Sequence, residues 1–204
     1  MIRTLSAMAT ALTLTAPVSA LAQDRENIVL QTFSTATVFA PPPWASATDA
    51  VMAESEIFQN GQEHDNGSKT YILEFIPKGQ SFDAWTQMHA LMAQVPAQPA
   101  ADHYAQQIAI YEQACTTMDH EHVVALDDHQ AGVVLCGAYA DDPTTGEVFV
   151  INQVARHGTA VKVYYHKRGP AFDVADPATY PLPLSSIADV LADLSATGVY
   201  PVTP

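Results

Sequence analysis

Basic residues are scarce in this chain. Only 8 of its 204 residues are Lys or Arg, against 22 Asp and Glu, and the formal net charge at pH 7 is −14. Proteins that bind nucleic acid or anionic lipid surfaces use clustered Lys and Arg, which displace counterions. We therefore predict no nucleic-acid partner. The acidic balance instead favours solubility and would attract cationic partners.

Recognisable catalytic motifs are also lacking. The sequence contains no Gly-x-Ser-x-Gly nucleophile elbow, no Gly-rich phosphate loop, no dinucleotide-binding fingerprint and no EF-hand loop. Its acidic pairs, Asp127-Asp128 and Asp141-Asp142, stand where turn chemistry explains them without a site. We therefore predict a protein that is not an enzyme, with a hydrolase that uses a carboxylate site as the alternative.

Long hydrophobic runs are confined to the N-terminus. Met1 and Arg3 form a short positive region, an uncharged apolar stretch follows, and Ala-Leu-Ala at residues 20–22 matches a cleavage site. These features predict a secretory signal peptide over residues 1–22 and a periplasmic or secreted mature protein. No later stretch is long and apolar enough for a transmembrane helix, so we predict no integral membrane segment after cleavage.

Cysteine is limited to two residues, Cys115 and Cys136. In an exported chain, two cysteines predict one disulfide bond. Their spacing is not Cys-x-x-Cys, which disfavours a thioredoxin-like redox role, and a bridged pair offers no thiolate nucleophile. Closing a loop of about 22 residues would stabilise the fold by roughly 3 kcal/mol in the chain-entropy view.

Hydrophobic periodicity predicts a single-domain α+β fold, in which helices pack against an antiparallel β-sheet. Residues 23–67 are expected to form an N-terminal arm and first strand region, and residues 68–204 the α+β core. Alternation with a period of two predicts strands at residues 51–61, 70–77, 122–126, 131–139, 146–156 and 160–168. Apolar residues three or four apart predict helices at residues 81–95, 101–115 and 185–198.

Three segments together resemble a family of uncharacterised exported bacterial proteins. They are "YILEFIPKGQSFDAWTQM", "YEQAC" and "VVLCGAYADDPTTGEVFVINQVARHGTAVKVYYHKR", and the resemblance covers about residues 68–168. In outline, the pattern is similar to the PsbP/Mog1-like α/β/α sandwich. The resemblance implies the same kind of fold, with a Trp-bearing helix, and the same disulfide bond. It implies no catalytic residues.

The motif "DHEH" is the candidate metal site. His120 and His122 stand two residues apart, so on a strand both imidazoles would share one face. His129 lies across a predicted hairpin turn and could supply a third ligand. Imidazole and carboxylate ligands suit copper or zinc. The competing interpretation is a solvated strand start and loop without a metal ion.

Two further groups are candidates for contact with a ligand or partner. Trp44, at the end of "APPPW", could form an exposed patch for an unknown protein partner. Tyr164, Lys167 and Arg168 belong to "YYHKR", the one basic cluster, which could bind a small anionic ligand or pair with local carboxylates. We therefore predict an exported, non-enzymatic binding or accessory module, and a histidine-dependent copper or zinc protein is the alternative.

Overall fold

The fold was analysed in a computed structural model that describes residues 26–202. The predicted signal peptide lies outside these residues. Within them the elements are β1 (Ile28–Thr32), β2 (Thr35–Phe39), a 3₁₀ turn (Thr48–Ala50), α1 (Val51–Glu54), β3 (Ser55–Glu63), β4 (Lys69–Pro77), β5 (Gln87–Val95), α2 (Ala100–Ala114), β6 (Cys115–Leu126), β7 (His129–Tyr139), β8 (Thr145–Arg156), β9 (Thr159–Pro170), a second 3₁₀ turn (Pro177–Thr179), α3 (Leu184–Ser195) and β10 (Gly198–Pro201).

Most of the strands form one antiparallel sheet, in the order β3-β4-β5-β9-β8-β7-β6. Three hairpin-linked strands form one end of this order, and α2 carries the chain from β5 to the opposite edge, where β6 begins. A second, three-stranded sheet has the order β1-β2-β10. The predicted antiparallel sheet with packed helices is thus present, although strands dominate over helices.

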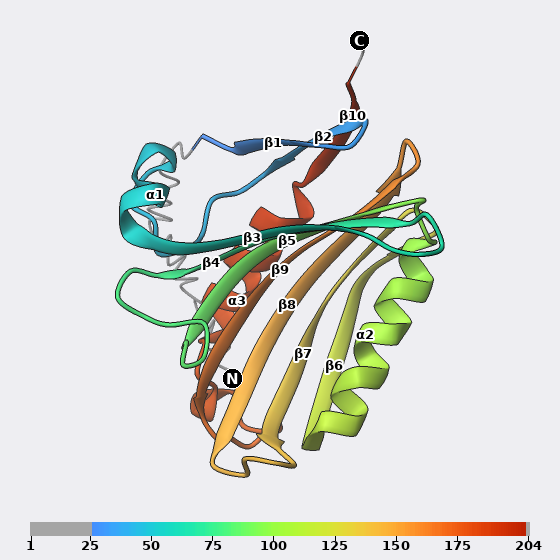
Figure 1. Ribbon diagram of the computed structural model, residues 1–204. Helices are drawn as coiled ribbons and strands as arrows, with labels where there is room; N and C mark the ends of the chain where they lie inside the picture. Colours follow the sequence, from blue (N-terminus) through green and yellow to red (C-terminus); the bar gives the residue numbers. More distant parts are fainter. Residues whose placement is uncertain (1–25, 203–204) are drawn as a thin grey trace, which may run out of the picture.

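The two longer helices lie on opposite faces of the large sheet (Figure 1). α3 packs against β7, β8 and β9, and the small sheet contacts the same face through β2 and β10. α2 packs on the other face against β6, β7 and β8. Each face therefore has its own buried cluster, one around Leu91, Val150 and Leu194, the other around Tyr111 and Phe149.

The helix predicted at residues 81–95 is wrong, because most of this segment is the strand β5. β5 lies between β4 and β9, and most of its side chains are buried on both faces of the sheet. Met88 and Ala90 enter the cluster under α2, while Leu91 and Ala93 enter the cluster under α3. A strand buried on both faces carries a nearly continuous apolar run, which also matches a helical stripe. Trp85 therefore belongs to the loop before β5.

The other predicted elements are present with shifted ends. α2 ends at Ala114, so Cys115 is the first residue of β6 rather than the end of a helix. A turn at Asn66-Gly67 joins β3 to β4, and Gly67 has a positive φ of 77°. Within the expected N-terminal arm, β1 and β2 pair as a hairpin. The strand predicted at residues 51–61 begins later, after α1.

Candidate functional site

β9 carries a line of polar side chains on the face that α2 only partly covers. Successive strand residues point to opposite faces. Tyr164 lies in the cluster under α2, whereas Tyr165 and Val163 lie in the cluster under α3. Lys162, His166 and Arg168 therefore share the face of Tyr164, at intervals of two residues.

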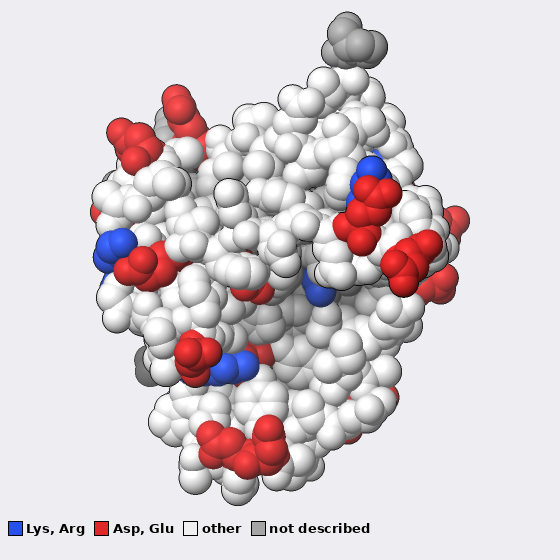
Figure 2. Space-filling view, in the orientation of Figure 1, with Lys and Arg blue, Asp and Glu red and all other residues white. Residues whose placement is uncertain are grey.

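The molecule is hollowed on this face, between α2 and the edge of the sheet formed by β3 and β4 (Figure 2). Figure 2 also shows that basic and acidic side chains lie within this depression. We call the region the sheet hollow and define its floor by Lys162, Tyr164, His166 and Arg168. The hollow exists because α2 packs over β6 to β8 and leaves the β9-β5 part of the face without a helix.

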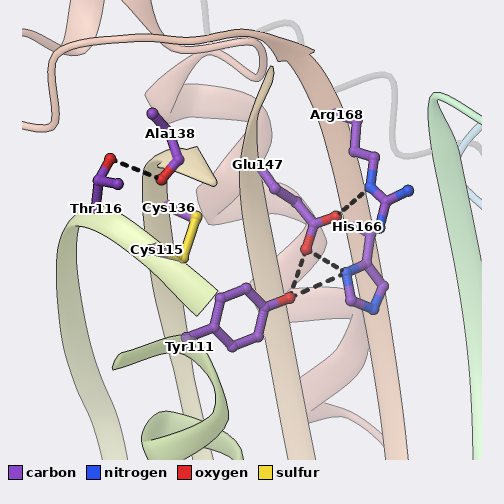
Figure 3. Close-up of a disulfide and its surroundings, with 8 residues drawn as sticks. All are labelled: Tyr111, Cys115, Thr116, Cys136, Ala138, Glu147, His166 and Arg168. Atoms are coloured by element: carbon purple, nitrogen blue, oxygen red, sulfur yellow. Dashed lines mark hydrogen bonds and ion pairs between the residues drawn. A yellow bond between two sulfur atoms is a disulfide. The ribbon is translucent and has the colours of Figure 1, made fainter. Parts of the chain in front are cut away.

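At one end of the sheet hollow lies a buried carboxylate, Glu147 of β8. Its side chain is fully buried, and three groups surround it (Figure 3). The Tyr111 hydroxyl donates to Oε1 at 2.5 Å, and Arg168 donates through Nε to Oε2 at 2.8 Å. His166 Nδ1 lies 2.8 Å from Oε1 and donates when that nitrogen is protonated. Both oxygens of the carboxylate are therefore in hydrogen-bond contact with neighbouring side chains.

These neighbours keep Glu147 ionised. Burial by itself would raise the pKa of the carboxyl group, but His166, the Tyr111 hydroxyl and Arg168 outweigh burial and lower its pKa to about 2. The pKa of Tyr111 moves the other way. Burial raises it well above its ordinary value, and the negative charge of Glu147 adds to the effect. Tyr111 therefore stays a neutral hydrogen-bond donor.

Arg168 is held on two sides and open on a third. Its guanidinium carbon lies 3.8 Å from the centroid of the Trp85 ring, a cation–π contact. Its Nε bonds to Glu147, and Figure 3 shows a terminal nitrogen pointing away from that carboxylate. The side chain is 38% exposed. Arg168 is therefore a rigid cation that still offers donors to solvent.

The other end of the sheet hollow contains Lys162. Its Nζ donates to the Gln107 side-chain oxygen of α2 at 3.0 Å and lies 4.9 Å above the centroid of the Tyr164 ring. Within residues 26–202, no carboxylate lies within ion-pair distance of Lys162; the side chains that do pair with a carboxylate there are Lys69, Lys78, Arg156, His166 and Arg168. Burial lowers the pKa of Lys162 to about 8, against the opposing effect of the Glu74 charge.

The predicted disulfide bond is present between Cys115 and Cys136, whose Cα atoms are 5.6 Å apart. Cys115 directly follows α2, and Cys136 stands opposite Glu147 in the pairing of β7 with β8 (Figure 3). Tyr111 lies one helical turn before Cys115. The bridge therefore fixes the end of α2 that supplies the Tyr111 hydroxyl to Glu147.

The candidate metal ligands occupy the β6-β7 edge of the large sheet. His120 and His122 are exposed on β6 and pair with Val134 and Gly132, so they share a face. The His122 ring stacks on Tyr104 with centroids 4.2 Å apart, and His129 Nε2 lies 2.6 Å from the Asn152 side-chain oxygen. In the described part of the chain, no group of three or more His, Cys, Asp and Glu is arranged to hold a metal ion. The metal site stays a hypothesis that rests on two histidines.

Of the four predicted ligand-contact residues, the structure brings two together, Tyr164 and Arg168. Lys167 alternates with them on β9 and so lies on the opposite face. Trp44 is distant in the chain and packs beside Tyr165, with its indole Nε1 donating to the Ser55 hydroxyl at 3.1 Å. Neither Lys167 nor Trp44 contributes to the sheet hollow.

The predicted site residues did not include Trp85, Tyr111, Glu147, Lys162 and His166. The sequence nevertheless contained a signal for Lys162, His166 and Glu147. Lys162, His166 and Arg168 stand at even intervals in "KVYYHKR", and an alternating strand places such residues on one face. Glu147 stands just before the apolar run "VFVI", where an acid is unusual in a strand with two buried faces.

No family model matches the sequence, and no curated protein matches it. The family resemblance stays a prediction, and no relative supplies functional residues. Within residues 26–202, no helix is both long and apolar enough to cross a membrane. Function must therefore be argued from the geometry of the sheet hollow.

Proposed function

We propose that this protein is an exported, non-enzymatic binding module that holds a small organic anion in the sheet hollow, with Arg168 as the anchoring cation. The observation that carries the proposal is the fixation of Arg168. Glu147 holds its Nε and Trp85 covers one face of its guanidinium, while the side chain keeps access to solvent. An arginine that is ordered before its ligand arrives loses little entropy on binding.

The distribution of charge supports a binding site for an anion in the sheet hollow and not elsewhere on the surface. The chain as a whole is strongly acidic, which disfavours anions over most of its surface. Arg168 is one of its 8 basic residues and lies on the floor of the sheet hollow. Aromatic side chains at Trp85 and Tyr164 provide apolar contact for the body of an organic molecule. Inorganic anions lack such a body and would bind less well.

The same geometry supports binding rather than catalysis. Glu147 is ionised and its oxygens already accept from Tyr111, His166 and Arg168. A general base needs an oxygen within hydrogen-bond reach of a substrate proton. In this proposal, Glu147 therefore positions Arg168 and does not touch the ligand.

The test is an NMR titration of ¹⁵N-labelled protein lacking residues 1–22, with benzoate as the anionic probe and benzyl alcohol as the uncharged control. Benzoate should shift the backbone amides of β9 and the Arg168 Nε resonance, and benzyl alcohol should not. Arg168→Gln should weaken benzoate binding by about tenfold or more, because a charge-assisted hydrogen bond is lost.

Arg156→Gln is the matched control. Arg156 also bonds a carboxylate through Nε at 2.8 Å, that of Asp128, but at the β8-β9 hairpin outside the sheet hollow. Its loss should leave benzoate binding unchanged. Equal effects of the two substitutions, or equal binding of benzoate and benzyl alcohol, would contradict the proposal.

A copper or zinc protein is the second candidate function, favoured by the shared face of His120 and His122 on an edge strand. Calorimetric titration with Cu²⁺ and Zn²⁺ tests it. Micromolar binding that is lost in His120→Ala with His122→Ala, and kept in His157→Asn, would support it. His157 is exposed in the β8-β9 turn with a positive φ of 53°, which Asn tolerates. Absence of binding to the wild-type protein would dismiss this candidate.

A further inference from the structure

Lys162 has a chemistry that the anion proposal does not use. It lies six residues before Arg168 on the same strand, so their Cα atoms are about 20 Å apart at ~3.3 Å per residue. A small molecule anchored on Arg168 therefore does not reach Lys162. The two ends of the sheet hollow can act independently.

The surroundings of Lys162 are polar but contain no paired anion. Gln107 of α2 accepts its hydrogen bond, and the Tyr164 ring lies beneath its Nζ. Gln153 stands opposite Lys162 in the β8-β9 register, is 3% exposed, and has a side-chain oxygen without a hydrogen-bond partner. Buried lysines are ordinarily paired with a carboxylate. Lys162 is instead held by the neutral amide of Gln107, on the floor of the sheet hollow.

We propose that the ε-amine of Lys162 is a covalent docking group, which condenses with the carbonyl carbon of a small aldehyde or ketone in the sheet hollow to form an imine. The amine nitrogen attacks the carbonyl carbon, and a proton passes from the nitrogen to the carbonyl oxygen to give a neutral carbinolamine. The hydroxyl group takes up a proton and leaves as water while the C=N bond forms, and the nitrogen then gives up its second proton to leave the imine. One amine and one carbonyl compound thus give one imine and one water, without an oxidant or reductant.

The ionisation of Lys162 itself and of Glu74 suits these steps. Desolvation lowers the pKa of the lysine to about 8, so a substantial fraction is neutral and nucleophilic near neutral pH. Glu74 of β4 is partly buried, and desolvation raises the pKa of its carboxyl group. It interacts with the Tyr164 hydroxyl and with the charge of Lys162. In this proposal Glu74, once protonated, supplies the proton that expels water.

Reductive trapping tests the proposal. The protein lacking residues 1–22 is incubated at pH 7.5 with benzaldehyde, an uncharged probe, and sodium cyanoborohydride, which reduces an imine to a stable amine. Peptide mass spectrometry then measures labelling at the four lysines, Lys69, Lys78, Lys162 and Lys167, and separately at the α-amino group. Lys162 should be labelled at least about tenfold faster than the exposed, carboxylate-paired Lys69 and Lys78.

Three comparisons decide the outcome. In urea-unfolded protein, the preference for Lys162 should disappear, because it depends on the folded environment. Glu74→Gln should slow labelling of Lys162 severalfold without altering labelling of Lys78. Benzoate, which the anion proposal places on Arg168, should leave Lys162 labelling within about twofold when added in excess, and this separates the inference from the anion proposal. Equal labelling of Lys162 and Lys78 in the folded protein would overturn the inference, as would a preference that survives unfolding.

Discussion

Glu147 on β8 stands directly opposite Arg168 on β9, and Arg168 Nε lies 2.8 Å from Glu147 Oε2. This pairing makes a fully buried carboxylate possible. An ionised carboxylate inside a protein is costly unless donors surround it, and Tyr111 and His166 complete the set with Arg168. The same contacts fix Arg168 at the rim of the sheet hollow, so the stability of the sheet and the order of the candidate anchor depend on one residue.

Replacing Glu147 should therefore destabilise the protein strongly. Glu147→Gln leaves Arg168 without its partner and weakens the bonds from Tyr111 and His166, and we expect a loss of about 3 kcal/mol in the free energy of unfolding. Urea denaturation followed by circular dichroism measures it. Glu63→Gln is the control, because the Glu63–Lys69 pair is exposed and should contribute less than about 1 kcal/mol. Similar losses in both variants would show that the buried Glu147–Arg168 pair contributes no more to the free energy of unfolding than an exposed pair does.

The low pKa of Glu147 also predicts how stability depends on pH. The carboxyl group titrates near pH 2 in the folded protein and near 4.5 when unfolded, so below pH 4.5 the unfolded state binds more protons. The contribution of Glu147, on the order of 3 kcal/mol, is complete above pH 4.5 and is lost as the pH falls toward 2. The difference in unfolding free energy between wild type and Glu147→Gln should accordingly shrink over this range. A difference that is constant from pH 5 to pH 2.5 would refute the assignment.

Part of this site could have been derived from the sequence. A two-residue turn at His157-Gly158, where both residues have positive φ, fixes the β8-β9 register, and that register places Glu147 opposite Arg168. Alternation along β9 then puts Lys162 on the same face.

Other parts could not have been derived. Tyr111 reaches Glu147 only because α2 crosses from β5 to the opposite edge of the sheet, and nothing local in the sequence specifies that crossing. The prediction of a helix at residues 87–95 was wrong for a different reason. Their burial on both faces removes the polar alternation that would have distinguished a strand from a helix. Trp85 was therefore placed on a helix, and its contact with Arg168 was not foreseen.

α2 approaches the sheet closely at Gly132 of β7. A Cβ atom there would collide with the Tyr104 hydroxyl of α2 and with the Glu121 carbonyl of β6. Gly132→Ala should therefore lower the free energy of unfolding by about 1–3 kcal/mol, as overpacking does. Gly61→Ala is a matched control in an antiparallel strand, since its Cβ would meet no atom closer than 3.8 Å. Equal stabilities of the two variants in urea denaturation would show that α2 shifts without cost.

The disulfide bond should stabilise both the fold and the Glu147 cluster. Cys115→Ser with Cys136→Ser releases a constraint worth roughly 3 kcal/mol in the chain-entropy view, and it frees the end of α2 that carries Tyr111. We expect the free energy of unfolding to fall by about that amount. Hydrogen exchange should become faster in the last turn of α2, before it does so in α3 on the opposite face. The wild-type protein treated with dithiothreitol should behave like the double variant, which separates loss of the bridge from any effect of serine. Unchanged exchange at the end of α2 would show that packing alone holds Tyr111 against Glu147.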